Sequence, residues 1–428
     1  MRWERALLAL CLAACDASAA ARSEDPAVRA AREDDLPTLL DSLRAAPGEL
    51  GRDDVGLEDA SGHALDTFHA ALRRAERGEG QTSIAVYGGS HTAGDLYTGR
   101  IREVLQARFG DAGHGFVPLV PVVRDHWAWG MTIDEAEGFE VMQVSFKRRD
   151  VFRYGLAGAA FLADEPEAFA AVGSDHWGNG REASHLDLLY DRLPGGGTLE
   201  VWLDGQRVDA LDTASDPPRN GLASYDVSDG PHRLEVRAAG DGPVTVFGVV
   251  AERDTPGVIV HNLGLVGSKA RHQLLWDEAQ WAAYFRRLEP DLVVFAYGNN
   301  ETTDTHLGIE DHEAHLREAL ARVRREAPDA SCVLIGPTDR PHEAEDGALE
   351  ARPVVAELTE MQRRVAADLG CGFFDTLAFQ GGLGSGAEWL RHDPPYLGPD
   401  RQHLTREGYL RWGEAIVRSL LTGYRPPA

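Results

Sequence analysis

The stretch LVVFAYGNN, at residues 292–300, decides the fold class of this chain. Its first half is continuously apolar, whereas a strand with one face in water would alternate apolar and polar residues. A short continuous apolar run predicts a strand buried on both faces of a parallel sheet. The glycine and the two asparagines that follow predict a tight turn at the carboxyl end of that strand.

Comparable apolar runs recur along the chain, and stretches with helical spacing separate them. The runs cover residues 83–87, 258–260, 333–335 and 372–374. Between two of these runs, Leu316, Leu320 and Val323 recur at the spacing of one helix face. Alternating strands and helices predict a three-layer α/β sandwich with a parallel sheet. We expect this domain to occupy residues 57–114 and 256–428.

The pattern changes between residues 115 and 255, where strand-like runs follow one another without helices. These runs are HLDLLYDRL, GTLEVWLDGQRV, HRLEVRAAG and PVTVFGVVAER, and glycine-containing turns separate some of them. Short strands with turns at this spacing predict a β-sandwich or jelly-roll-like domain. We therefore expect residues 115–255 to form a β-rich insert that interrupts the α/β domain after its first strand and helix.

The first residues, MRWERALLALCLAACDASAA, have the pattern of an export signal. The apolar run at residues 6–14 is too short to span a bilayer, which needs about 20 residues, but it suits a secretory signal peptide. The tetrapeptide at residues 12–15 resembles a bacterial lipobox, in which Cys15 would carry a lipid and become the mature N-terminus. The alternative is an ordinary signal peptide that removes Cys15. We expect a signal or lipobox region at residues 1–21, a flexible leader at residues 22–56, and a periplasmic or cell-surface location.

The charge of the chain restricts its partners. Asp and Glu number 69 against 43 Lys and Arg, which gives a formal net charge of −26. Attraction to nucleic acid or to an anionic membrane surface is therefore not expected, and an anionic substrate would need local recognition. Four cysteines exclude a disulfide-built scaffold. Cys332 and Cys371 each begin a strand-like run, so two buried thiols and one disulfide are both compatible with the sequence.

Reactive residues follow the predicted strands at their carboxyl ends, where parallel sheets collect them. Ser90 follows the first strand, Gly267 follows the second, and Asn300 follows the third. Asp400 and His403 lie three residues apart before the last predicted helix. This set supplies a nucleophile, a base with a carboxylate to orient it, and donors for an oxyanion.

These four blocks, in this order, resemble those of the SGNH/GDSL hydrolase superfamily. The segment DRQHLTREGY, at residues 400–409, is similar to the D-x-x-H-L-T-x-x-G-Y form of the family's last block. The resemblance implies a catalytic triad of Ser90, His403 and Asp400. It also implies an oxyanion hole built from the backbone N–H groups of Ser90 and Gly267 and the side-chain amide of Asn300.

Within the superfamily the chain is most similar to the peptidoglycan O-acetylesterase type, which carries a β-rich, carbohydrate-binding-like insert. Further matching segments are SHTAGD, FGDAGHGFVP, YGLAG and QGGLGSGAEW. The resemblance implies an exported serine esterase that removes O-acetyl groups from a polysaccharide, with peptidoglycan favoured. Two positions depart from the family pattern: Gly89 replaces an aspartate that helps to hold the serine turn, and Glu301 replaces a second aspartate.

Two other functions remain open on the same residues. One is an acyltransferase that moves an acyl group to a glycan hydroxyl, and the other is a vestigial surface lipoprotein that only binds glycan. The expected partner is an acetylated glycan, with membrane contact only through a lipid on Cys15. No cofactor or metal is expected: His312 and His315 are one residue too close for an H-E-x-x-H zinc site, and we expect them on a solvated helix face.

Overall fold

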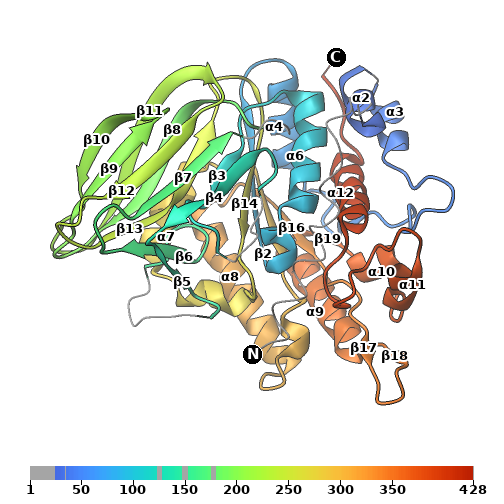
Figure 1. Ribbon diagram of the computed structural model, residues 1–428. Coiled ribbons are helices and arrows are strands. Elements are labelled where there is room, and N and C mark those ends of the chain that lie inside the picture. Colours follow the sequence, from blue (N-terminus) through green and yellow to red (C-terminus); the bar gives the residue numbers. More distant parts are fainter. Residues whose placement is uncertain (1–24, 34, 123–127, 147–152, 175–179, 428) are drawn as a thin grey trace.

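The computed structural model describes residues 25–33, 35–122, 128–146, 153–174 and 180–427. A twisted sheet covered by helices lies beside an antiparallel β-sandwich (Figure 1). The central sheet has the strand order β1-β19-β16-β15-β2-β14, and all its pairs are parallel except that of the edge strand β1 with β19. Its strands are β1 (Leu57–Glu58), β2 (Gln81–Gly88), β14 (Gly257–Gly264), β15 (Leu292–Ala296), β16 (Ser331–Ile335) and β19 (Gly372–Phe374).

Both faces of the central sheet are buried, as its continuous apolar runs require. On β2, Ile84 and Val86 belong to one hydrophobic cluster, whereas Ala85 and Tyr87 belong to the other. The long helices of the first cluster are α4 (Asp66–Glu76), α6 (Leu96–Phe109) and α12 (Arg406–Leu421). Those of the second are α7 (Glu278–Arg287), α8 (Ile309–Glu326) and α9 (Pro353–Leu369). The predicted three-layer α/β sandwich is confirmed.

The order of the strands places a switch point at the carboxyl end of β2. The chain begins the parallel sheet with β2, adds β14 on one side, and then adds β15 on the other. The connections after β2 therefore run to opposite sides, and such a switch point is where open α/β sheets bind their ligands. The residues that follow β2, β14 and β15 lie at this switch point.

Shorter elements complete the α/β domain. They are α2 (Pro26–Glu33), α3 (Leu36–Ser42), α5 (Ser90–Ala93), α10 (Thr376–Gln380), α11 (Gly386–Arg391) and the 3₁₀ turns η1 (Ala270–Leu275) and η2 (Glu301–Thr303). Between β16 and α9 the chain makes a small hairpin of β17 (His342–Glu343) and β18 (Leu349–Glu350), which projects from the body of the molecule (Figure 1).

The β-rich segment forms two antiparallel sheets whose inner faces share one hydrophobic core, so the predicted insert is confirmed as a fold feature. The sheets have the orders β10-β9-β12-β7-β4 and β11-β8-β13-β6-β5, and β3 pairs with β13. The strands are β3 (Gly115–Val117), β4 (Met131–Glu137), β5 (Glu140–Gln143), β6 (Ala159–Ala163), β7 (Phe169–Ser174), β8 (Ala183–Arg192), β9 (Thr198–Leu203), β10 (Gln206–Asp212), β11 (Arg219–Gly230), β12 (Arg233–Ala238) and β13 (Val244–Glu252).

Buried hydrogen bonds fix the insert against helix α7. The Tyr284 hydroxyl lies 2.7 Å from the carbonyl oxygen of Tyr190 and 2.9 Å from that of Gly221, both on the insert. The amide of Asn220 donates to the carbonyl oxygen of Gln280 at 3.0 Å. The insert is thus packed on the α/β domain through specific contacts rather than attached by the chain alone.

The expectation of a flexible leader at residues 22–56 is wrong for its described part. Helices α2 and α3 pack on the domain, and Leu39 and Leu43 are fully buried there. The Arg411 guanidinium donates to the carbonyl oxygen of Leu43 at 2.8 Å, and Arg100 pairs with Asp25 at 2.9 Å. The prediction rested on the many Asp and Ala residues of this segment. It overlooked apolar residues at helical spacing, which form the buried faces of the two helices. The predicted signal region and Cys15 lie outside the described residues, and no described helix is long and apolar enough to cross a membrane.

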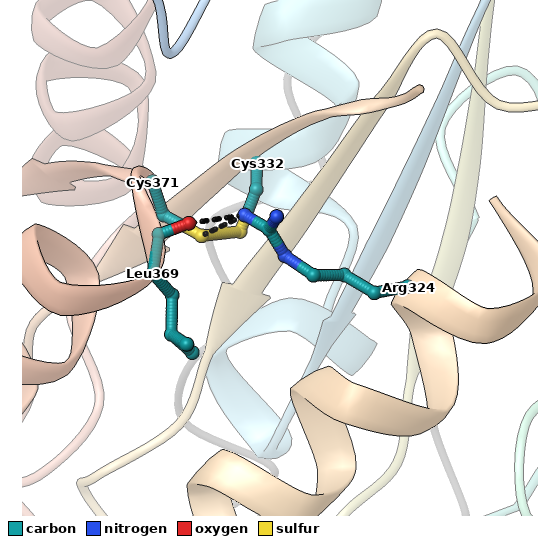
Figure 2. Close-up of a disulfide and its surroundings, with 4 residues drawn as sticks. All are labelled: Arg324, Cys332, Leu369 and Cys371. Carbon is teal, nitrogen blue, oxygen red and sulfur yellow. Dashed lines mark hydrogen bonds between the residues drawn. A yellow bond between two sulfur atoms is a disulfide. The ribbon is translucent and has the colours of Figure 1, made fainter. Parts of the chain in front are cut away.

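The structure joins Cys332 and Cys371 in a disulfide, which decides between the two alternatives that the sequence left open. Strands β16 and β19 are parallel neighbours with Val333 opposite Gly372, so the residues before them face each other with a Cα–Cα distance of 4.7 Å. Figure 2 shows Arg324, on α8, reaching this bridge, where it donates to the carbonyl oxygen of Leu369 and approaches the Cys371 Sγ at 3.6 Å.

Candidate active site

Ser90 lies at the turn between β2 and α5, at the switch point of the central sheet. Gly89 is the extended residue before the helix, and its carbonyl oxygen accepts hydrogen bonds from the backbone N–H groups of Thr92 and Ala93 at 3.1 and 3.0 Å. These bonds close a tight turn directly after the buried strand. The turn leaves Ser90 half-buried, whereas the three residues after it are buried.

Ser90, His403 and Asp400 form a continuous hydrogen-bonded chain. The Ser90 Oγ lies 2.7 Å from the His403 Nε2, and the His403 Nδ1 lies 2.6 Å from the Asp400 Oδ2. An ionised carboxylate can only accept, so it selects the histidine tautomer with a proton on Nδ1 and a free lone pair on Nε2. The Nε2 atom is then the acceptor for the serine hydroxyl, which is the arrangement that a general base requires.

Asp400 is stabilised in its charged form. Burial raises its pKa, but the hydrogen bond to His403, the electrostatic interaction with that ring and two backbone N–H donors outweigh burial and lower the pKa to about 2. Those donors are the N–H groups of Gln402 and His403, each 3.0 Å from the Asp400 Oδ1. The turn between the two residues is tight enough to hold Arg401 at a φ of 59°, a left-handed conformation that costs a non-glycine residue roughly 1–2 kcal/mol.

His91 packs under the His403 ring and was not identified from the sequence. The two ring centroids are 5.1 Å apart, and the His91 Nδ1 lies 3.0 Å from the Tyr409 hydroxyl. Burial and the charge of His403 hold the pKa of His91 well below its ordinary value. His91 therefore stays neutral beneath His403, so no permanent charge from it opposes the charge that His403 gains when it takes a proton.

The two predicted oxyanion residues that follow the other strands gather beside Ser90. Gly267, in the turn after β14, has a φ of 71°, which favours glycine. The Asn300 Nδ2, in the turn after β15, donates to the carbonyl oxygen of Ser268 at 2.9 Å. A Cβ atom on Gly89 would lie 2.7 Å from the same Nδ2, closer than real Cβ contacts. Glycine at position 89 thus lets the Asn300 amide close onto the serine turn, which gives a physical reason for this departure from the family pattern.

Asn299 and Asn300 have different surroundings. The Asn299 amide donates to the Thr338 hydroxyl at 2.5 Å, and its oxygen accepts from the Thr338 backbone N–H at 3.3 Å. Asn299 therefore ties its turn to the segment after β16, whereas Asn300 faces Gly89 and Ser268.

Glu301 joins the two turns that carry Gly267 and Asn300. Its side chain is buried, and its two oxygens accept hydrogen bonds at 3.0 Å from the backbone N–H groups of Gly298 and Ala270. Burial raises the pKa of this carboxyl group. Glu301, which replaces the family's aspartate, thus joins the turns after β14 and β15 through these two hydrogen bonds. We call this link the Glu301 clasp.

The insert contributes Phe146 to the edge of the site. The ring of Phe146 lies against Gly267: a Cβ atom on that glycine would be 2.3 Å from the tip of the ring. The Phe146 side chain is nevertheless 66% exposed. This large, exposed apolar ring stands beside Gly267, a predicted oxyanion residue, and no sequence pattern indicates this contact between distant segments.

No group of three or more His, Cys, Asp or Glu side chains is placed to hold a metal ion among the described residues. The expectation that His312 lies on a solvated face is wrong, because its side chain is buried, whereas that of His315 is half-buried. His312 begins the buried stripe of α8 that continues through Leu316 and Leu320.

Residues 229–411 match the model of the GDSL-like lipase/acylhydrolase family. The matched range contains Gly267, Asn300, Asp400 and His403. No curated protein matches the sequence significantly. This family match and the hydrogen-bonded Ser90, His403 and Asp400 support a carboxylic ester hydrolase with a GDSL-like acylhydrolase domain in residues 229–411.

Among solved structures, one described as a peptidoglycan O-acetylesterase in action is similar with a TM-score of 0.71 and 22% sequence identity. The similarity covers 86% of this chain and 99% of the other, so the two share the fold with its β-rich part. A family two carbohydrate esterase from Clostridium thermocellum, solved with cellohexaose, has a TM-score of 0.27 and 10% identity over 69% of this chain and 98% of the other.

Proposed function

We propose that the protein is an exported serine esterase that removes O-acetyl groups from a polysaccharide, with O-acetylated peptidoglycan as the favoured substrate. The observation that carries this proposal is the hydrogen-bonded chain of Ser90, His403 and Asp400 at the switch point of the sheet. The fold shared with a peptidoglycan O-acetylesterase supports the choice of polymer.

The reaction follows from the roles that this geometry permits. The Ser90 Oγ attacks the carbonyl carbon of the acetyl ester while the His403 Nε2 takes the hydroxyl proton. Collapse of the tetrahedral intermediate breaks the bond to the sugar oxygen, which leaves as a hydroxyl with the proton from His403. A water molecule then gives a proton to His403 and attacks the acetyl-serine, so that acetate leaves and the Ser90 hydroxyl is restored. Asp400 keeps the imidazole oriented and stabilises its charged form in both halves.

The negative charge that develops on the carbonyl oxygen needs donors placed in advance. The backbone N–H groups of Ser90 and Gly267 and the Asn300 Nδ2 are the proposed oxyanion hole. Asn300 keeps a second N–H on Nδ2 for this purpose after donating to Ser268. One such donor is typically worth about 10²–10³ in rate.

Two features support a short acyl group and an exported enzyme. Phe146 stands against Gly267 and restricts the space beside the carbonyl site, which favours acetyl over long chains. The disulfide between Cys332 and Cys371 is typical of an oxidising compartment, such as the periplasm or the cell surface. The signal-like residues 1–21 agree with that location, and lipidation at Cys15 would anchor the protein to a membrane.

A substrate panel tests this function. Purified protein is given O-acetylated peptidoglycan, acetylated xylan and nitrophenyl esters of increasing chain length, and acetate or nitrophenol release is measured. We expect acetyl esters to be preferred over longer esters, and acetylated peptidoglycan over acetylated xylan.

The same panel separates the alternatives. Acetyl transfer to an added glycan acceptor, in place of acetate release, would identify an acyltransferase. Binding of a polysaccharide without turnover of any ester would identify a glycan-binding protein that has lost its activity.

A further inference from the structure

Two arginines, Arg340 and Arg352, lie at the base of the β17–β18 hairpin. His342 pairs with Glu350 and Glu343 pairs with Leu349 across this hairpin. The same antiparallel register, continued two residues toward the base, sets Arg340 opposite Arg352. Burial and the charge of Arg352 lower the pKa of Arg340 and outweigh the charge of Asp400, which raises it.

Arg340 lies between the two turns that carry the candidate catalytic residues. Its guanidinium donates to the carbonyl oxygen of Asn299 and to the Thr302 hydroxyl, both at 3.3 Å. It also donates to the side-chain oxygen of Gln402 at 2.5 Å. The Gln402 Nε2 in turn lies 3.5 Å from the His403 Nε2. A group bound at this guanidinium is therefore next to the proton acceptor of Ser90.

All three of these acceptors are neutral, and within the described part of the chain neither Arg340 nor Arg352 meets a carboxylate within ion-pair distance. The Arg352 Nε is buried without a hydrogen-bond partner among those residues. Other partly buried arginines of this acidic protein do meet carboxylates: Arg100 contacts three of them, and Arg363 also contacts three.

Two adjacent, partly buried positive charges with no carboxylate within ion-pair distance repel each other and lose hydration, which is unfavourable unless an anion joins them. Arg352 also precedes helix α9, whose first turn holds no acidic residue and whose N-terminus has no side-chain cap. The positive end of this helix adds to the local potential. The structure therefore holds a cationic position beside its ester-hydrolysing site in a chain whose formal net charge is −26.

We propose that Arg340 and Arg352 form a subsite for a carboxylate on the glycan substrate, which places the acetyl ester of the same or the adjoining sugar at Ser90. This inference rests on the proposed function for the identity of the ester. Guanidinium groups match the planar carboxylate with paired hydrogen bonds, and Arg340 already holds the turns of Asn299 and Gln402 in place. The negative net charge of the chain repels an anionic polymer. The two arginines would bind such a polymer locally despite this repulsion.

Binding to an inactive Ser90→Ala protein tests the subsite without relying on turnover. The probes are N-acetylmuramic acid, which carries a lactyl carboxylate, N-acetylglucosamine, which is its neutral counterpart, and glucuronic acid, which carries the carboxylate on the ring. We expect an acid to bind roughly 10-fold or more tightly than the neutral sugar. Adding Arg352→Gln should abolish this preference, whereas Arg364→Gln, an exposed arginine on the same helix, should keep it.

The outcomes separate this inference from the proposed function. A preference for N-acetylmuramic acid assigns the carboxylate to a lactyl group, and a preference for glucuronic acid assigns it to a uronic acid. Equal binding of acids and neutral sugar, or a preference that survives in Arg352→Gln, would overturn the subsite. If an acid binds through Arg352 but the wild-type protein releases acetate from no ester, the subsite stands and the proposed function fails.

A kinetic comparison adds a second readout in active protein. Arg352→Gln should lower kcat/KM on acetylated peptidoglycan roughly 10-fold or more beyond any loss on nitrophenyl acetate, because the small ester carries no carboxylate. An equal loss on both substrates would show that Arg352 only maintains the structure and would overturn the subsite.

Discussion

Gly89 determines how closely the Asn300 amide approaches the serine turn. The family pattern has an aspartate here, and its loss leaves open what holds the turn. The contacts supply an answer: position 89 is where the Asn300 amide packs, and backbone hydrogen bonds to the Gly89 carbonyl oxygen close the turn without a side chain. In this chain, Gly89 and the adjacent Asn300 amide thus take the place of the aspartate side chain of the family pattern.

We therefore expect Gly89→Ala to lower kcat about 10-fold or more, because its Cβ would displace the Asn300 amide from the oxyanion position. Gly94→Ala is the matched control: it lies in the same short turn, and its Cβ would make only ordinary contacts of 3.7 Å or more. Steady-state kinetics on nitrophenyl acetate measure both. Full activity of Gly89→Ala, or an equal loss in both variants, would contradict this role of Gly89.

The ionisation of Asp400 makes the stability of the folded protein depend on pH. Its pKa is about 2 in the folded protein against an ordinary value of 3.8, so its charged form stabilises the folded state above about pH 4. That contribution is lost as the pH falls toward about 2. We expect Asp400→Asn to unfold at a lower temperature than the wild type near neutral pH, with a difference that shrinks as the pH approaches about 2.

The same variant should lose activity by up to about 10⁴-fold, because an amide no longer fixes the required histidine tautomer. Asp41→Asn, an exposed carboxylate on α3, is the control and should keep both activity and stability. A constant difference in unfolding temperature across the whole pH range would argue against the linkage.

At the level of elements, the turns after β14 and β15 act as one unit because Glu301 clasps them. Glutamine can accept only one of the two backbone hydrogen bonds, since its amide nitrogen would face an N–H donor. We expect Glu301→Gln to lower the free energy of unfolding by about 1–3 kcal/mol and to lower kcat while KM changes little. Thermal unfolding and kinetics measure these effects, with the exposed Glu357→Gln as a control. Unchanged kcat would show that the clasp does not position the oxyanion donors.

The disulfide links two neighbouring strands of the sheet at their amino ends, whereas the candidate active site lies at the carboxyl ends of the strands. It closes a loop between positions 39 residues apart, for which chain-entropy arguments give a stabilisation of roughly 4 kcal/mol. The Cys332→Ala/Cys371→Ala double variant should therefore unfold at a lower temperature but keep its kcat. Reductant should lower the unfolding temperature of the wild type and leave the double variant unchanged; no effect on the wild type would contradict the bridge.

For the whole molecule, the sequence was most informative where a pattern is local. Continuous apolar runs predicted the parallel sheet, and the residues that follow these runs predicted the positions of Ser90, Gly267 and Asn300. The structure brings these residues together because parallel strands end at one edge of a sheet. The spacing of Asp400 and His403 before the last helix likewise predicted that the two residues act together, since a tight turn presents both side chains on one side.

Contacts between distant segments could not be read in the same way. Phe146 reaches Gly267 from the insert, Glu301 binds Ala270 across two loops, and Arg340 meets Arg352 only through a short hairpin. The leader was misjudged for a different reason: its composition suggested disorder, and only its packing shows that Leu39 and Leu43 are buried. Composition alone does not decide whether a short amphipathic segment finds a surface to cover.

The most direct test of the central claim is acetate release from O-acetylated peptidoglycan by the wild type and by Ser90→Ala, which removes only the hydroxyl that lies 2.7 Å from His403. We predict steady acetate release by the wild type and, in Ser90→Ala with its unfolding temperature unchanged, a rate lower by at least about 10³-fold. Equal rates for the two proteins would contradict the account of Ser90 as the nucleophile of an acetyl esterase.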